Sequence, residues 1–509
     1  MSLIALILAC QGPDAGDKAK NKPDTGEPAA CVAVREICGN EIDEDCDGVD
    51  PVCLNSLNDA FASWEGASAE GWSGDVLAAL GDVDGDGQPD FAVGSKGVGD
   101  LDGEVSIVTN HTAGAARSLS NTWAGFTTSG DDADQFGTAI AGLVERDRTT
   151  HHGYAIGAAM AERGVGSVYL LTGPASQGTV DLSLEVDNTD LVQYVGPMTG
   201  SLAGHAVAFA GFLDGDDHPD LVVGARRASE SGDYRDDQGA AYILFGPFDR
   251  DAGEPQTRSL DLEGTTIWGG GNGHSAGCAV AGLGDVDGDG LAEVAVSACD
   301  AGNNSGAVFL VDDSSDHRLA ADPDFALMGE QPGDHAGVLV QSAGDADGDG
   351  NADVLVMAHS CGFDLQGCAN QNFGRSSWYI LTGARLEANA ASFNMSLSLA
   401  WTRVTHPEQD NHYSCRSAAV GDFAGADGPD LAIGGCWESA GGVHVLPDML
   451  GGSYEAPSED FTVLSGVSEG DLAGAELAVV GNSLIIGAWA AGTDPLQAGA
   501  VYAMPAGSF

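Results

Sequence analysis

Basic residues are scarce in this sequence. Its 509 residues include 19 Lys and Arg against 77 Asp and Glu, which gives a formal net charge of −58 at pH 7. So few cations exclude the basic surface that binding to nucleic-acid phosphates requires. The acidity suits an extracellular protein in calcium-rich surroundings, although solubility alone, or adaptation to high salt, accounts for the same composition.

Long apolar runs are also missing, and aromatic residues make up 6% of the chain. No run reaches the roughly 18 apolar residues of a membrane-spanning helix. Glycine, in contrast, is abundant, with 75 residues, and the hydrophobic share of 43% is enough to build a core. Short apolar segments between glycine-rich turns favour β-strands over helices.

One acidic loop sets the pattern for the rest of the chain. Residues 81–90 read GDVDGDGQPD, so Asp82, Asp84, Asp86 and Asp90 occupy positions 1, 3, 5 and 9 between two apolar runs. Calcium takes six to eight oxygen ligands in irregular geometry, and the glycines allow the Gln88 carbonyl to turn inward at position 7. The loop therefore predicts a calcium site; the alternative is an acidic hairpin turn without a metal.

The loop recurs along the chain. Two further copies are complete, with Asp285, Asp287, Asp289 and Glu293, and with Asp345, Asp347, Asp349 and Asp353. Two are eroded, and the sequence leaves open whether they bind a metal. One keeps Asp214, Asp216 and Asp220 as candidate ligands but has Phe212 at position 1, and the other keeps Asp422 and Asp430 but has Ala424 and Ala426 at positions 3 and 5. Two more segments, beginning at Phe136 and Gly474, keep the flanking apolar runs without the loop.

These seven units repeat every 60 to 75 residues, roughly, and such long periods are typical of propellers and solenoids. Each unit also contains a later apolar segment such as GEVSIVT, GSVYLLTG or GAVYAMP, and then a fourth short one. Four short strands per unit predict an all-β fold, a seven-bladed β-propeller of four-stranded blades. The last unit lacks a fourth strand, so we expect the N-terminal segment DAFASWEG (residues 59–66) to complete the last blade and close the ring.

The phrases Phe136-Gly137, Gly157-Ala158-Ala159 and GDVDGDG-x-x-D followed by AVGS resemble the FG-GAP repeat of the integrin α-subunit propeller. The resemblance covers about residues 60 to 509 and implies the fold and the calcium loops; many functions share this fold. It further implies that ligands bind on the face opposite the calcium loops. By this resemblance the candidates are Trp72, Asp134, Arg226, Arg227, His335, His412, Trp437 and Trp489.

Three shorter segments precede the predicted propeller of residues 58–509. Residues 1–10 (MSLIALILAC) resemble a bacterial lipoprotein signal with Cys10 as the lipidated residue, although no Lys or Arg precedes the run; an ordinary signal peptide is the alternative. Residues 11–30 read as a flexible acidic tether. Residues 31–57 are cysteine-rich, and their alternating carboxylates resemble a metal-binding motif of bacterial surface proteins: Asp43, Asp45, Asp47 and Asp50. A disulfide knot with a solvated acidic turn is the alternative there.

The cysteines indicate an oxidising compartment. Eleven cysteines less a lipidated Cys10 leave ten, an even number. Cys278 and Cys299 occupy the same repeat positions as Cys415 and Cys436, at the start of a first strand and the end of a second, so each pair is expected to form a disulfide. Two further sets are expected to pair: Cys361 with Cys368, and Cys31, Cys38, Cys46 and Cys53 among themselves, in an order that the sequence leaves open.

No catalytic residues are predicted. The sequence lacks an H-E-x-x-H motif and a phosphate-binding glycine loop, and its twelve histidines are scattered. The sequence therefore favours a calcium-stabilised, extracellular or surface-anchored binding protein that recognises a protein or a carbohydrate. The alternative is a secreted propeller enzyme, a hydrolase or lyase acting on polysaccharide or phosphoester, and a third reading is a structural component of the cell envelope.

Overall fold

The structure is a computed structural model of the whole chain. It describes residues 56–505 except 58–59, 69, 110–116, 120–123, 129–132, 145–150, 173–177, 183–190, 249–256, 312–316, 319–324, 360–375, 390–393, 407–416, 425–427, 436–439, 450, 457, 459–460 and 492–497. Within these ranges no helix is both long and apolar enough to cross a membrane.

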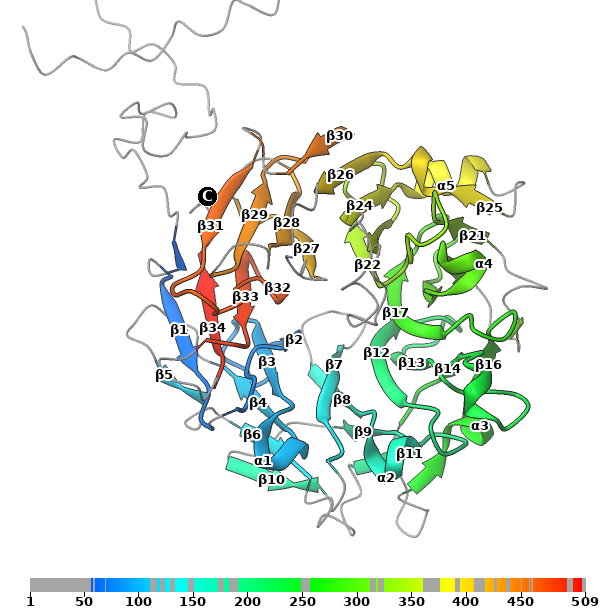
Figure 1. The fold of residues 1–509 in the computed structure, drawn as a ribbon, viewed down its shortest axis with the longest axis horizontal. Coiled ribbons are helices and arrows are strands. Elements are labelled where there is room, and N and C mark those ends of the chain that lie inside the picture. The colour runs from blue at the N-terminus through cyan, green and yellow to red at the C-terminus, as the bar shows by residue number, and fades with distance from the viewer. Residues whose placement is uncertain are drawn as a thin grey trace, which may run out of the picture.

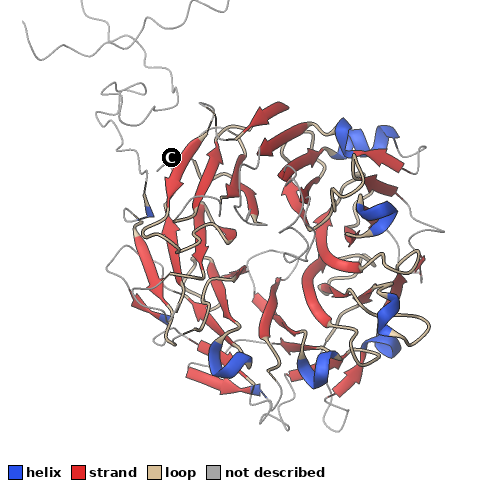
Figure 2. Ribbon diagram, in the orientation of Figure 1, coloured by secondary structure: helices blue, strands red, loops and turns tan. Residues whose placement is uncertain are grey.

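Seven antiparallel sheets form a closed ring around a central axis, so the all-β, seven-bladed propeller is confirmed (Figures 1 and 2). We number the blades in chain order, and in each the first strand lies nearest the axis (Figure 1). Blade 1 comprises β2 (Val76–Gly81), β3 (Asp90–Ser95), β4 (Glu104–Val108) and β6 (Ala124–Thr127). Blade 2 comprises β7 (Phe136–Val144), β8 (His151–Ala158), β9 (Ser167–Thr172) and β11 (Leu191–Val195). Blade 3 comprises β12 (Ala203–Gly211), β13 (Asp220–Ala225), β14 (Ala240–Leu244) and β16 (Thr265–Trp268).

The remaining blades follow the same order of strands. Blade 4 comprises β17 (Ala276–Gly284), β18 (Glu293–Ala298), β19 (Ala307–Val311) and β21 (Phe325–Met328). Blade 5 comprises β22 (Leu339–Gly344), β23 (Asp353–His359), β24 (Ser376–Leu381) and β26 (Thr402–His406). Blade 6 comprises β27 (Ala418–Gly421), β28 (Asp430–Gly434), β29 (Gly442–Leu446) and β31 (Thr462–Ser465). Blade 7 comprises β32 (Glu476–Val480), β33 (Ser483–Ala488), β34 (Ala500–Met504) and the N-terminal β1 (Ala62–Glu65).

The ring is closed by the N-terminal strand, as predicted. β1 pairs antiparallel with β34, from Ala62 opposite Ala503 to Glu65 opposite Ala500, and Figure 1 shows these two strands side by side. Trp64 on β1 is 2% exposed and its ring lies 5.3 Å from that of Phe91 in blade 1. The closing strand therefore anchors blade 7 to blade 1 by backbone hydrogen bonds and aromatic packing.

A fifth, parallel strand was not predicted. In six blades, the fourth strand pairs with a short strand from the following blade, in the segment that links strands three and four of that following blade. These short strands are β5 (Arg117–Ser118), β10 (Gly178–Asp181), β15 (Thr257–Ser259), β20 (His317–Arg318), β25 (Asn394–Ser396) and β30 (Gly452–Glu455). In blade 6 the same place is taken by Ser56, which forms a parallel bridge to Ser465. Each outer edge strand is thus covered by its neighbour.

Glycines explain how closely the blades approach one another. Gly306, at φ 76°, forms a parallel bridge to Ala336 of the next blade, and a Cβ there would lie 2.2 Å from the Ala336 nitrogen and 2.2 Å from its oxygen. Gly224 at the end of a second strand likewise faces Gly277 of the next blade. The glycines of the repeated phrases therefore let backbone pack on backbone.

Second strands are buried along their whole length, as Asp90–Ser95, Asp220–Ala225 and Glu293–Ala298 show. Neighbouring strands cover both edges and neighbouring blades both faces, which explains why these strands read as nearly unbroken apolar runs. An acid begins five of the seven second strands, so a loop carboxylate lies in the core there, whereas β8 begins with His151 and β33 with Ser483. The few helices are short: α1 (Val98–Leu101), α2 (Ala161–Gly164), α3 (Leu260–Glu263), α4 (Ala301–Asn304) and α5 (Gly383–Asn389), with two 3-10 turns, η4 (Tyr234–Asp236) and η6 (Leu397–Leu399).

Candidate functional site

The propeller has two chemically different faces. The turns between strands one and two, such as residues 82–90, lie on the acidic-loop face. Because those strands are antiparallel, the segments that lead into strand one and out of strand two lie together on the other side. We call this side the opposite face, and it carries Trp72, Arg226 and His335.

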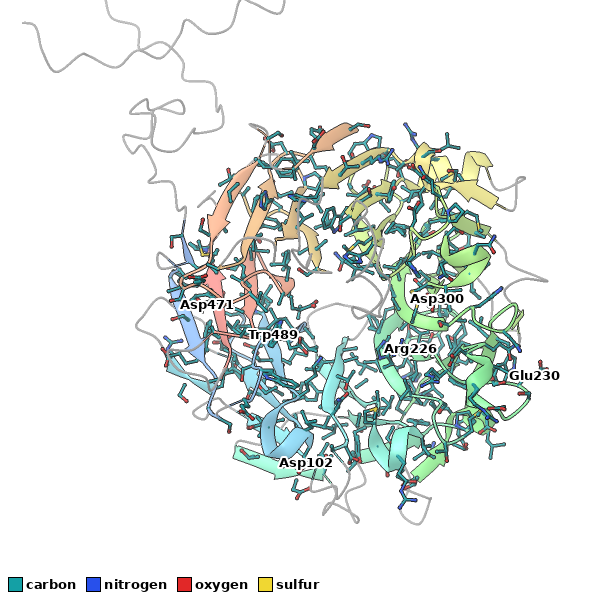
Figure 3. The ribbon with its side chains drawn as sticks, viewed as in Figure 1. Asp102, Arg226, Glu230, Asp300, Asp471 and Trp489 are labelled. Atoms are coloured by element: carbon teal, nitrogen blue, oxygen red, sulfur yellow. A yellow bond between two sulfur atoms is a disulfide. The ribbon has the colours of Figure 1, made fainter. Side chains whose placement is uncertain are left out.

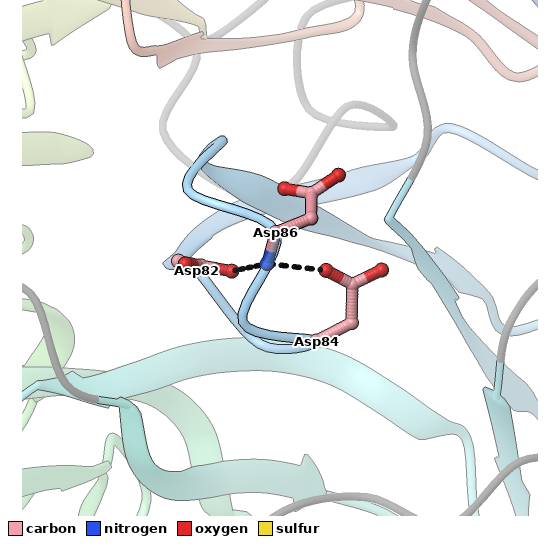
Figure 4. A group of neighbouring side chains, drawn as sticks. All are labelled: Asp82, Asp84 and Asp86. Atoms are coloured by element: carbon pink, nitrogen blue, oxygen red, sulfur yellow. Dashed lines mark hydrogen bonds between the residues drawn. The ribbon is translucent and has the colours of Figure 1, made fainter.

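The first acidic loop gathers three carboxylates around its own backbone (Figure 4). Asp82 accepts hydrogen bonds from the N–H groups of Gly85, Asp86 and Gly87, and Asp84 accepts a second one from Asp86 at 3.1 Å. Gly85 and Gly87 have φ of 79° and 85°, which the tight turn requires. The loop is therefore held in shape by its acids.

Among the residues that the structure describes, three groups of carboxylates are each close enough to share a metal ion. In each, one oxygen per residue lies within 4.8 Å of the others: Asp82, Asp84 and Asp86; Asp285, Asp287 and Asp289; and Asp345, Asp347 and Asp353. Clustered carboxylate oxygens are the donor set that hard divalent cations prefer.

The ninth-position carboxylate has a second role that the sequence did not reveal. Asp90 accepts a hydrogen bond from the Val83 N–H at 2.7 Å, and Glu293 accepts one from Val286 at 2.6 Å. The other oxygen of each, Asp90 Oδ1 and Glu293 Oε1, is buried and has no hydrogen-bond partner among the described residues. Since a buried carboxylate oxygen without a partner is costly, a cation at these two loops fits the structure.

In the eroded loops, the second oxygen of the ninth-position acid does have a hydrogen-bond partner. Asp220 accepts from Leu213 with Oδ2 and from Gly246 with Oδ1. Asp430 accepts from Phe423 and Ala424 with Oδ2 and from Asp448 with Oδ1. Both oxygens are satisfied by the backbone, which explains why this acid persists where other ligands are lost. Asp353 is bonded in the same way, although its loop keeps its other acids.

Electrostatics favour a cation in the complete loops. Burial, opposed by the hydrogen bond from Val83 and helped by the charges of Asp84, Asp86 and Asp82, raises the pKa of Asp90 to about 7. The same causes raise the pKa of Glu293 to about 8. A bound cation would relieve both the burial and the repulsion.

One predicted disulfide is present. Cys278 and Cys299 are joined across β17 and the end of β18, with their Cα atoms 6.3 Å apart. The other predicted pairs lie outside the described residues, as do Cys10, the acids of residues 43–50, His412 and Trp437.

Charged residues from three blades meet on the opposite face. Asp300, after β18, is hydrogen-bonded to Nδ1 of His335 at 2.9 Å and accepts a bond from the Ser275 hydroxyl at 2.7 Å. Arg227 pairs with Asp237 at 2.7 Å, and Arg226 lies beside it. Burial raises the pKa of Asp300, but the bonds from His335 and Ser275 and the charges of His335 and Arg226 bring it below its ordinary value.

Ser275 lies in a G-x-S-x-G pentapeptide, residues 273–277, which the sequence reading overlooked. A nucleophile elbow joins a strand to a helix, whereas this serine leads into a first strand. Its φ of 53° is shared by Trp72, Leu202 and Leu472 at the same repeat position, so it belongs to the repeat. Its hydroxyl bonds to Asp300 rather than to an imidazole, which is not the arrangement that activates a serine.

Blades 7 and 1 bring together a second group. The rings of Trp72 and Trp489 lie 6.1 Å apart at 73°, and both side chains are partly exposed. Lys96, which follows β3, forms an ion pair with Asp75. Glu476, at the start of β32, is acted on by the charges of both. The other predicted candidate, Asp134, is 8% exposed and offers little surface to a ligand.

Sequence reasoning missed Asp75, Lys96, Glu476, Asp300 and Ser275. A signal was present, because Lys96 and Trp489 occupy the same repeat position as Arg226, two residues after the second-strand glycine. Asp75 directly follows a first-strand glycine, in the phrase Ser73-Gly74. Polar residues at these repeat positions mark the opposite face.

No protein-family model matches the chain. A segment of 100 residues is 40% identical to integrin alpha pat-2 of Caenorhabditis elegans, covering 20% of this chain and 7% of that protein. Integrin alpha-4 of Xenopus laevis is 29% identical over 215 residues (41% and 18%), and integrin alpha-IIb of Homo sapiens 33% over 168 residues (32% and 15%). The chain thus spans less than a fifth of the length of these relatives.

Solved structures resemble the chain more distantly. Hydrazine synthase of Kuenenia stuttgartiensis matches with a TM-score of 0.44 and 11% identity, covering 87% of this chain and 98% of that one. The Dos1 propeller matches with a TM-score of 0.36 and 11% identity, covering 81% and 74%. Likeness at this level says nothing about function.

Proposed function

We propose that this protein is a calcium-stabilised recognition propeller that works outside the cell and binds a protein or a carbohydrate with its opposite face. The observation that carries the proposal is the division of labour between the faces. Acidic loops with buried, unsatisfied carboxylate oxygens lie on one side. Aromatic and cationic residues from several blades gather on the other, in a chain where cations are scarce.

The loops are proposed as stabilising sites rather than catalytic ones. Asp82, Asp285 and Asp345 at position 1, with their partners at positions 3, 5 and 9, would hold the ion. Calcium is proposed because an all-carboxylate and carbonyl donor set in an irregular loop suits it better than magnesium or zinc. Binding to the folded chain alone stabilises it by mass action.

An extracellular setting is supported by the Cys278–Cys299 disulfide, since such bonds persist in oxidising compartments. Local similarity to integrin α subunits favours a surface role and recognition by the propeller. Attachment through a lipid on Cys10 is a proposal that rests on the sequence.

The test is a binding screen with the full chain. Purified protein in millimolar calcium is applied to an array of extracellular matrix proteins and glycans. The same screen uses a variant of the opposite face, Arg227→Ala with Trp489→Ala. A control on the acidic-loop face is Asn482→Ala, an exposed residue in the turn between β32 and β33, which has no acidic loop. Melting curves establish that each variant is folded.

We expect at least one array member to bind, with binding lost in the opposite-face variant and kept in the control. Absence of any ligand, or loss of binding in the control alone, would contradict the proposal. Release of a cleaved product from a bound polysaccharide would favour the enzyme alternative instead.

A further inference from the structure

The junction between blades 7 and 1, where the chain closes its ring, combines two tryptophans with three charged side chains. We propose that this junction site, formed by Trp72, Asp75, Lys96, Glu476 and Trp489, binds an uncharged sugar ring of an extracellular carbohydrate. This rests on the proposed function, because it assigns a ligand class and a location on the same face.

The aromatic part offers a flat apolar surface. Trp72 and Trp489 meet edge to face, with ring centroids 6.1 Å apart, so neither indole covers the full face of the other. Gly97 packs against Trp72: a Cβ at that glycine would come within 3.0 Å of Cδ2. The two rings are thus fixed in position while remaining partly exposed. A fixed indole presents an apolar face for the C–H groups of a sugar and one N–H donor.

The polar part offers both kinds of hydrogen-bond partner that sugar hydroxyls require. Asp75 and Glu476 supply acceptor oxygens, and Lys96 supplies donors. The Asp75–Lys96 ion pair holds two of these side chains in place. Burial raises the pKa of Glu476 to about 8, Asp75 adds to the rise and Lys96 opposes it, so this carboxyl also carries a proton to donate near neutral pH. A few polar groups beside an apolar surface are typical of ligand sites.

Charge decides which sugar fits. With Glu476 protonated, the Lys96–Asp75 ion pair leaves the junction site itself without net charge, inside a protein whose net charge is −58. An anionic sugar would be repelled by the surrounding field, whereas a neutral ring would not. The negative charge of the protein alone would also allow a basic peptide to bind. The flat faces of the two indoles favour a ring-shaped ligand over such an extended peptide.

The junction site is separate from the Arg226–Asp300 group. Figure 3 places Trp489 on the inner part of blade 7, across the ring from Arg226 and Asp300. Substitutions in one group can therefore be made without touching the other, and additive effects are expected at this separation.

The experiment is calorimetric titration of the full chain, in calcium, with named neutral trisaccharides of glucose, galactose and N-acetylglucosamine. A glucuronic-acid oligosaccharide and a lysine-rich peptide serve as charged comparisons. Variants are Trp489→Ala, Trp489→Phe, Lys96→Gln and Arg227→Ala, with the exposed turn residue Asn482→Ala as the control, and melting curves confirm folding. We expect a neutral sugar to bind, Trp489→Ala to weaken it about tenfold, and Trp489→Phe to weaken it less.

Four results would overturn the proposal. They are binding of none of the neutral sugars, sugar binding that survives Trp489→Ala, sugar binding that depends on Arg227 instead, and Trp489-dependent binding of the basic peptide alone. Since the array screen includes proteins, a protein ligand on the opposite face with no sugar bound would overturn the sugar site and leave the proposed function standing. No ligand of either class would overturn both.

Discussion

Replacing Gly306 by alanine tests how the blades are held together. Gly306 directly precedes the third strand of blade 4, has φ of 76°, and lies against the backbone of Ala336, which leads into blade 5. A Cβ there would lie 2.2 Å from two Ala336 backbone atoms, closer than any real contact, so one blade must move. Gly273, at φ 74° with nothing within 4 Å of its would-be Cβ, is a matched control for backbone strain alone.

The magnitude follows from these two positions. Left-handed backbone costs an alanine roughly 1–2 kcal/mol, offset by about 0.4–1 kcal/mol from the stiffer unfolded chain. Overpacking at Gly306 adds roughly 1–3 kcal/mol. We therefore expect Gly306→Ala to lose about 2 kcal/mol more than Gly273→Ala, measured as urea midpoints by tryptophan fluorescence and circular dichroism. Equal midpoints for the two variants would refute the close backbone contact between blades.

Three further predictions concern the packing of the ring. His406 and His444 are 6% and 0% exposed, and burial lowers the pKa of each from 6.5 to about 4, with His406 also acting on His444. Because both histidines stay neutral in the fold, each contributes about 3 kcal/mol to the free energy of unfolding above pH 6.5, and this contribution is lost as the pH falls from 6.5 through 4. The plot of urea midpoint against pH should be flatter over this range in the variant with both histidines replaced by leucine, and a slope equal to that of the wild type would argue against the prediction. Replacing Cys278 and Cys299 by alanine should cost about 3 kcal/mol, since the closed loop holds some twenty residues; unfolding midpoints unmoved by the change would count against it. Trp64→Ala should cost about 3–5 kcal/mol and expose the chain ends to protease, whereas wild-type resistance would show that the closing strand is dispensable.

Much of the fold could be predicted because the sequence repeats once for each blade. The seven acidic or loop-free hairpins gave the number of blades, and the missing fourth strand of the last unit gave the closure by β1. The parallel fifth strands escaped prediction because β5 and β20 are two residues long, too short for a periodic pattern. They form only where one blade meets the next.

The site was predictable in its loops and much less so on its opposite face. Asp90 carries a ligand signal in the sequence, but its bond to Val83 and its orphaned oxygen depend on a fully buried strand. Asp300 and His335 are 35 residues apart in the sequence and come into contact only because blades 4 and 5 pack side by side. The unpredicted features are therefore contacts between units, which no single repeat encodes.

Calcium titration of the full chain by calorimetry, with a melting curve in chelator, asks whether the acidic loops hold calcium. We predict that calcium binds and raises the melting temperature, because each occupied site adds about 2.7 kcal/mol to the free energy of unfolding at a hundredfold excess of calcium over its dissociation constant. We also predict that Asp82→Ala, Asp285→Ala or Asp345→Ala each removes one site, while Asp214→Ala in an eroded loop removes none. If calcium gave no heat of binding and no change in melting temperature, or if none of the three loop variants lowered the stoichiometry, the acidic loops would not be calcium sites.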